Sequence, residues 1–151
     1  MIAGTKKKVA GFTLIELLVT IALVIVMATI AVPNFKSLIE RNRLSSDFNI
    51  ILSSLNYARS EAVKRRENVT VQVSGAWQVL VQTEASGSVT TLRQVSSNDG
   101  SVSVSPDPFE VTFNALGRSP NCKSATPCDL SIIYNESEAL NVNAAGNISR
   151  P

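Results

Sequence analysis

The longest unbroken apolar stretch of the chain runs from Phe12 to Val32 and contains one ionisable side chain, Glu16. As an α-helix with a rise of about 1.5 Å per residue, it would be about 30 Å long, which matches the hydrocarbon thickness of a bilayer. A buried helix of a soluble domain would need more surrounding chain than remains. A cleaved secretory signal has a shorter apolar core and a small-residue cleavage site, whereas this stretch ends at Val32-Pro33. The pattern therefore predicts a membrane-spanning helix.

Beyond Pro33 the apolar residues recur every three or four positions, which predicts an amphipathic helix that ends near Arg66. Proline removes a backbone donor, so we expect Pro33 to bend or locally open the helix. The last turn carries Lys64, Arg65 and Arg66, which suit a helix C-terminus, with a lipid or nucleic-acid contact as the alternative. The apolar stripe that should pack on a sheet comprises Phe35, Leu38, Ile39, Leu44, Phe48, Ile51, Leu52, Leu55, Ala58 and Ala62.

After Asn68 apolar and polar residues alternate in short runs, which is typical of β-strands. Val69 to Val73, the turn at Gly75 and Trp77 to Val81 predict a hairpin. Glycines and prolines separate the later runs. Further strands are expected at 89–95, 101–105, 111–114, 130–134, 140–143 and 147–150. The chain is therefore predicted to have an α+β fold, with one long N-terminal helix, transmembrane in its first half, packed on an antiparallel β-sheet head.

Composition argues against catalysis. The chain has 151 residues, two cysteines and no histidine, so it holds no Ser-His or Cys-His pair and no zinc site with histidine ligands. It shows no glycine-rich phosphate loop and no paired acids. We expect no enzyme activity, cofactor, metal or small-molecule substrate. A net charge of +2 is also too small for a protein whose whole surface binds nucleic acid.

The charges around the apolar stretch predict its orientation and raise a question. Lys6, Lys7 and Lys8 directly precede the stretch and should hold that end on the cytoplasmic side. An unpaired carboxylate such as Glu16 near the start of a membrane helix costs a few kcal/mol. The lysines lie more than two helical turns earlier. Glu16 therefore either reaches the membrane interface or finds its partner on another chain.

The segment from Lys6 to Leu18 resembles the class III leader and mature start of type IV pilins and type II secretion pseudopilins, with a short basic leader, Gly11, Phe12 and a glutamate at the fifth mature position. The resemblance implies that a prepilin peptidase cleaves between Gly11 and Phe12 and that the new amino group of Phe12 is methylated. It also implies that Glu16 pairs with the Phe12 amino group of a neighbouring subunit, which would set the register between subunits. The expected organisation is a leader at 1–11, a membrane and assembly helix at 12–33, an amphipathic helix at 34–67 and a periplasmic β-rich head at 68–151.

Three further segments resemble the FimT/FimU minor pilins and the GspH minor pseudopilins: the Ala-Arg-Ser-Glu-Ala run at 58–62, Gly75-Ala76-Trp77, and the run from Phe113 to Arg118. Packing and turn formation alone also explain these residues. The resemblance implies a minor pilin that is stored in the inner membrane, helps to prime pilus assembly and sits in the tip complex. Its partners would be other minor pilins and the major pilin, and it would support twitching motility and adhesion. The alternatives are a GspH-like minor pseudopilin of a type II secretion system and a DNA-binding competence pilin.

Cys122 and Cys128 lie six positions apart in a proline-containing loop. Outside the cytoplasm such a pair is expected to form a disulfide, which would contribute about 2 kcal/mol in the chain-entropy model. A redox-active pair is the alternative, but the spacing is not Cys-x-x-Cys.

The charges divide unevenly along the chain. Cleavage would remove three of the 14 basic residues and leave fewer basic than acidic groups, of which there are 12. Positions 36–67 hold seven basic and four acidic residues, and positions 69–151 hold four and seven. A basic helix and an acidic head suit head-to-tail stacking of subunits.

The same asymmetry bears on DNA binding. FimT-type DNA receptors carry a Gly-Arg-x-Arg tail, and here Asn147 stands where its first arginine would be. Arg150 and Arg118 would be the candidate contacts, and two arginines on an acidic head should bind DNA weakly. Nucleic acid is therefore a less favoured partner.

Overall fold

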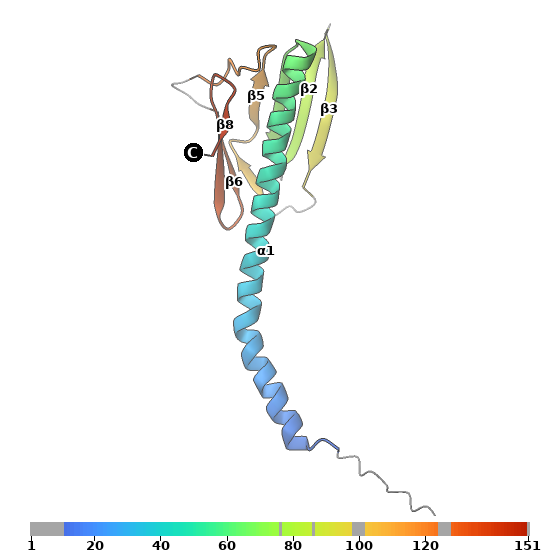
Figure 1. Cartoon of the computed structure of the whole chain (residues 1–151), viewed down its shortest axis with the longest axis vertical. Coiled ribbons are helices and arrows are strands. Elements are labelled where there is room, and N and C mark those ends of the chain that lie inside the picture. The colour runs from blue at the N-terminus through green and yellow to red at the C-terminus, as the bar shows by residue number, and fades with distance from the viewer. Residues whose placement is uncertain (1–10, 76, 86, 98–101, 124–127, 151) are drawn as a thin grey trace, which may run out of the picture. The chain divides into compact units, whose positions relative to one another are not determined.

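Figure 1 shows the computed structural model of the chain, which describes residues 11–75, 77–85, 87–97, 102–123 and 128–150. The predicted leader therefore lies outside the described residues, except for Gly11. The chain divides into two compact units between Leu38 and Ile39. Helix α1 (Leu14–Arg65) passes from the first unit into the second.

In the first unit α1 begins at a capped N-terminus. The Glu16 amide donates to Thr13 Oγ1 at 3.2 Å, and the Leu17 amide donates to the Thr13 carbonyl at 3.2 Å. Of the two effects expected at Pro33, a bend or a local opening, the local opening is absent, because the helix continues through this residue. Its most apolar 18-residue window has a mean hydropathy of 2.7, and none of that window is buried. By length and composition alone, α1 is the one helix of the described residues that could cross a membrane.

In the second unit the remaining part of α1 packs against strands. Six of the eight buried positions of α1 belong to the predicted apolar stripe, which ends with the small residues Ala58 and Ala62. The helix ends at Arg65, and Arg66 takes the left-handed conformation with φ 60°. The Glu67 amide then donates to the Ala62 carbonyl at 3.3 Å, as in a Schellman cap. The predicted end of the helix is thus confirmed to within one residue. The buried helix positions are Leu44, Phe48, Ile51, Ser54, Leu55, Ala58, Glu61 and Ala62.

The strands form two four-stranded antiparallel sheets. The first has the order β3-β2-β1-β5, and the second has the order β4-β6-β7-β8. The predicted hairpin is confirmed, with Val71 opposite Val81. Strand β1 also pairs with β5, which is far from it in the sequence. The bounds are Val69–Ser74 for β1, Gln78–Ala85 for β2, Ser88–Ser96 for β3, Ser103–Ser105 for β4, Phe109–Phe113 for β5, Cys128–Ile133 for β6, Ser137–Val142 for β7 and Ile148–Ser149 for β8.

The core of this unit lies between the helix and the strands. Val69, Val71 and Val73 are fully buried on alternate positions of β1, as the alternation in the sequence predicts. The turn between β6 and β7 also contacts the helix: Asn135 Nδ2 donates to Glu40 Oε2 at 2.8 Å, and Arg41 pairs with Glu136 at 3.0 Å. These long-range contacts attach the second sheet to the helix.

Candidate functional site

The predicted cleavage bond lies in an exposed, non-helical stretch before α1. Gly11, Phe12 and Thr13 are not helical, and Phe12 is 86% exposed. A Cβ added at Gly11 would meet no described atom within 4 Å. Lys6 to Lys8, the basic part of the predicted leader, lie outside the described residues. The described part of the segment is therefore open to a peptidase.

Thr13 is a site residue that the sequence reasoning missed. Its side chain accepts the Glu16 amide, which makes Thr13 the N-cap of α1 and places Glu16 in the first helical turn with an exposed side chain. The signal was present as Thr-x-x-Glu, the pattern of a capping box. A carboxylate in the first turn also suits the positive end of the helix dipole. Glu16 thus stands four residues after the predicted new N-terminus at Phe12.

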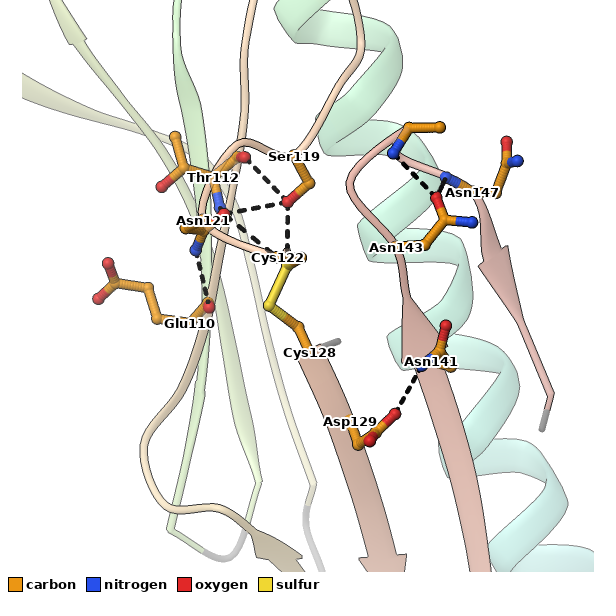
Figure 2. The surroundings of a disulfide bond; sticks show 11 residues. Glu110, Thr112, Ser119, Asn121, Cys122, Cys128, Asp129, Asn141, Asn143 and Asn147 are labelled. Atoms are coloured by element: carbon orange, nitrogen blue, oxygen red, sulfur yellow. Dashed lines mark hydrogen bonds between the residues drawn. A yellow bond between two sulfur atoms is a disulfide. The ribbon is translucent and has the colours of Figure 1, made fainter. Parts of the chain in front are cut away.

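The predicted disulfide is confirmed, with an S–S distance of 2.02 Å and a Cα–Cα distance of 5.1 Å between Cys122 and Cys128. Figure 2 shows how the loop before it is attached to β5. Asn121 Oδ1 accepts the Thr112 amide at 3.2 Å, and its Nδ2 donates to the Glu110 carbonyl at 3.3 Å. Cys128 is the first residue of β6. The disulfide therefore joins a loop fixed to the first sheet with a strand of the second sheet.

Two turns of the head have the same construction. The first follows β5 and the second follows β7, and each begins with an asparagine whose side chain accepts two backbone amides. Asn114 Oδ1 accepts the amides of Leu116 and Arg118, both at 3.0 Å. Asn143 Oδ1 accepts those of Ala145 and Asn147, again at 3.0 Å, as Figure 2 shows for the second turn. The shared sequence is Asn-Ala-x-Gly, and we call these the twin turns (114–118 and 143–147).

The twin turns pack against each other, and the first of them also packs against α1. A Cβ added at Gly146 would lie 2.0 Å from the Gly117 carbonyl oxygen. A Cβ added at Gly117 would lie 3.1 Å from Val63 Cγ2 and 3.3 Å from Arg59 Nε. The amide of Ser119, the residue directly after the first turn, donates to the Ala144 carbonyl of the second turn at 3.2 Å. The resemblance at 58–62 and 113–118 thus corresponds to one packing contact in the fold.

Arg118 and Arg150, the candidate DNA contacts, belong to different segments of the head, because Arg118 lies in the first twin turn and Arg150 follows β8. Arg118 is exposed on the first twin turn, which packs near Arg59. The Arg150 guanidinium lies 4.1 Å from the centroid of the Phe48 ring and 3.2 Å from Glu138 Oε2. Phe48 and Arg59 are eleven residues apart, or about 16 Å along a helix. Arg150 thus contacts Phe48 and Glu138, whereas Arg118 makes no ion pair or ring contact among the described residues.

The basic end of α1 is partly neutralised. Glu61, which is buried, accepts from Arg65 at 2.7 Å and from Lys64 at 3.4 Å. The hydrogen bond from Arg65 lowers the pKa of the Glu61 carboxyl below its ordinary value of 4.5; burial opposes this shift, and Lys64 adds to it. The same bond raises the pKa of Arg65. Two of the three basic residues at this end, Lys64 and Arg65, are therefore paired with Glu61 within the helix.

The described residues contain no group of three or more His, Cys, Asp or Glu side chains that could hold a metal ion. A long N-terminal helix, apolar in its first part and packed in its second part on antiparallel sheets, defines the class of type IV pilins and pseudopilins. The family model described as type II transport protein GspH matches residues 48–146, and the model described as the prokaryotic N-terminal methylation motif matches residues 6–32. The chain belongs to the GspH family of pilin-like proteins.

Solved structures extend the comparison. The chain is similar to the type IV minor pilin FimU of Pseudomonas aeruginosa strain PAO1, at 26% identity and a TM-score of 0.60, over 74% of this chain and 90% of that one. A second crystal form of FimU matches at 25% identity and a TM-score of 0.57, over 72% of this chain and 92% of that one. Comparison with curated protein sequences finds no match. The resemblance to FimU-type pilins drawn from the sequence is thus confirmed, as is the pilin-like fold.

Proposed function

We propose that the chain is a minor type IV pilin that helps to prime pilus assembly and sits in the tip complex, where it supports twitching motility and adhesion. The observation that carries this proposal is the FimU likeness, which extends over 90% of the FimU chain, together with the methylation motif at 6–32. Membership of a pilin family and the pilin fold indicate a structural rather than an enzymatic protein. The apolar helix and the motif indicate storage in the inner membrane before incorporation.

The assembly mechanism follows from the N-terminal segment. Prepilin peptidase would cleave between Gly11 and Phe12 on the cytoplasmic face and methylate the Phe12 amino group. Lys6 to Lys8 would keep that end in the cytoplasm, so the head would lie in the periplasm. Glu16 would then pair with the Phe12 amino group of the next subunit. In an apolar bundle a paired carboxylate stabilises one register, and an unpaired carboxylate penalises the others.

The cleavage step is tested with Gly11 variants of the full chain. Gly11→Ala should be processed partly or poorly, and Gly11→Trp should leave the full-length precursor in the membrane. Intact-mass analysis of the membrane fraction measures the outcome. The matched control is Gly87→Ala, a glycine of the head with no described atom within 4 Å of an added Cβ. Normal maturation of Gly11→Trp would contradict the leader assignment.

The register step is tested with Glu16→Ala. This variant should be processed and inserted in the membrane but poorly incorporated into filaments. The control is Glu84→Ala, which removes an exposed carboxylate of β2 and should leave incorporation unchanged. Piliation and twitching equal to wild type in Glu16→Ala would remove the register role.

The second candidate is a minor pseudopilin of a type II secretion system, which the description of the matching family model favours. The two machines differ in the other minor subunits that they contain. Co-purification of the full chain from detergent-solubilised membranes identifies those subunits. Minor pilins of a pilus would support the first function, and pseudopilins would support the second.

A further inference from the structure

Most basic side chains of the unit from Ile39 onward already have partners. Arg43 makes interactions of its own. Among the described residues of this unit, Arg59, Arg66, Arg118 and Lys123 are left with no ion pair and no ring contact. The partnered ones are Arg41 with Glu136, Lys64 and Arg65 with Glu61, Arg93 over the Tyr57 ring, and Arg150 with Glu138.

Three of these four unpaired cations belong to one place in the fold. A Cβ added at Gly117 would lie 3.3 Å from Arg59 Nε and 3.1 Å from Val63 Cγ2. Arg118 is the next residue of that turn. Arg66 follows Val63 by three residues, at the end of α1. Lys123 instead belongs to the disulfide loop. Unpaired positive charge is thus concentrated where the first twin turn meets the helix.

The same place exposes apolar surface. Leu116 is 74% exposed, the highest value for a large apolar side chain among the described residues from Ile39 onward, and Val63 is 49% exposed. Leu116 is held in a fixed turn, because its own amide is bonded to Asn114 Oδ1. Gly117, which follows Leu116, packs on Val63, so the two exposed apolar side chains belong to the same contact between the turn and the helix.

We propose that one surface, which we call the arginine–leucine patch, docks the head of another pilin-type subunit. Carboxylates of that subunit pair with the arginines and surround an apolar contact. The patch comprises Arg59, Val63, Arg66, Leu116 and Arg118. The proposal rests on the function proposed above. The apolar side chains favour a protein over nucleic acid, because phosphate binding uses clustered cations and gains nothing from an exposed leucine. A head of this kind offers the complementary charge, since positions 69–151 of this chain hold seven acidic and four basic residues.

The experiment is site-specific photocrosslinking in the full chain, expressed in cells that assemble the filament. The photoreactive residue p-benzoylphenylalanine replaces Leu116 in one variant and Val89, which is 63% exposed on β3, in the control. We expect position 116 to give an adduct that mass spectrometry identifies as another pilin-type subunit. Position 89 should give none with that subunit.

Charge reversal tests the arginines. Arg118→Glu should lower the yield of the 116 adduct at least about tenfold, because a like charge at such a contact costs several kcal/mol. Lys123→Glu makes the same charge change outside the patch and should leave the yield unchanged. Arg66→Glu is a second variant of the patch and should also lower the yield of the 116 adduct. It replaces Arg118→Glu if that substitution lowers the amount of folded chain.

Three results would overturn the inference. The first is an equal yield of the 116 adduct in Arg118→Glu and Lys123→Glu. The second is an adduct with the pilin-type subunit from position 89 in place of 116, and the third is a nuclease-sensitive adduct, which would indicate nucleic acid. The same samples show whether the chain is shortened at Gly11. A chain that is not shortened refutes the proposed function and the inference together. A shortened chain in the filament fraction without the 116 adduct overturns the inference alone.

Discussion

Gly146→Ala is expected to destabilise the head more strongly than other glycine substitutions, because two costs combine at this position. Gly146 has φ +76°, and an L-residue in this left-handed region costs about 1 kcal/mol. The added methyl group would also lie 2.0 Å from the Gly117 carbonyl oxygen. The twin turns would have to separate by more than 1 Å to restore an ordinary contact of about 3.4 Å.

That separation should break hydrogen bonds between and within the turns. The bond from the Ser119 amide to the Ala144 carbonyl spans the two turns at 3.2 Å. The bond from the Gly146 amide to the Asn143 carbonyl, at 2.8 Å, closes the second turn. Each contributes about 1 kcal/mol, so with the backbone cost the total is about 3 kcal/mol.

The assay is urea unfolding of the full chain in detergent micelles, followed by tryptophan fluorescence. Trp77 is the single tryptophan of the chain and is 2% exposed, so its emission reports on the head alone. With a urea m-value of about 2 kcal/mol/M, Gly146→Ala should lower the unfolding midpoint by about 1.5 M.

The control is Gly87→Ala, which shares the left-handed backbone at φ +78° but has no described atom within 4 Å of the added Cβ. It should lower the midpoint by about 0.5 M. Gly117→Ala should fall between the two, because its closest contact is the side chain of Val63, which can move. Equal shifts for Gly146→Ala and Gly87→Ala would refute the reasoning from the close contact.

Three further predictions concern the disulfide, the helix end and the C-terminal strand. Replacing Cys122 and Cys128 by serine should lower the free energy of unfolding by about 2 kcal/mol, measured by the same urea titration, because the bridged positions are only six apart. Acidification below pH 4.5 should destabilise the wild type more than Glu61→Gln, measured as the urea midpoint against pH. The pKa of Glu61 is lowered in the folded state, so its carboxylate stabilises the fold above the unfolded pKa. This stability is lost as the pH falls through the folded pKa. Arg150→Ala should lower the free energy of unfolding by about 1 kcal/mol through loss of its contacts with Phe48 and Glu138.

Each of these has a result that contradicts it. An unchanged midpoint in the serine variants, or after reduction of the wild type, would remove the stabilising role of the disulfide. Parallel pH profiles for wild type and Glu61→Gln would mean that the Arg65 and Lys64 contacts add no stability. An unchanged midpoint in Arg150→Ala would mean that its contacts with Phe48 and Glu138 add no stability. In a gel-shift titration with duplex DNA at about 0.15 M salt, tight binding that Arg150→Ala abolishes would favour the DNA-binding alternative.

The local patterns of the sequence predicted much of this molecule. The 21-residue apolar stretch, the three-and-four spacing after Pro33 and the alternation after Asn68 each reflect the geometry of one element, so they predicted the helix and the strands closely. The leader resemblance pointed to the family that the comparisons show. The capping box at Thr13 and the repeated Asn-Ala-x-Gly of the twin turns were equally local and were overlooked.

What only the tertiary structure decided depends on residues that are distant in the sequence. Periodicity shows which face of a strand is buried but not which strand lies beside it, so the pairing of β1 with β5 and the division into two sheets were not predictable. The same holds for side chains. Arg150 lies on Phe48, whereas Gly117, the residue before Arg118, lies beside Arg59 and Val63. The sequence by itself determined the elements and the family. The fold determined which charges are paired and which remain available to a partner, because pairing requires the long-range contacts that folding creates.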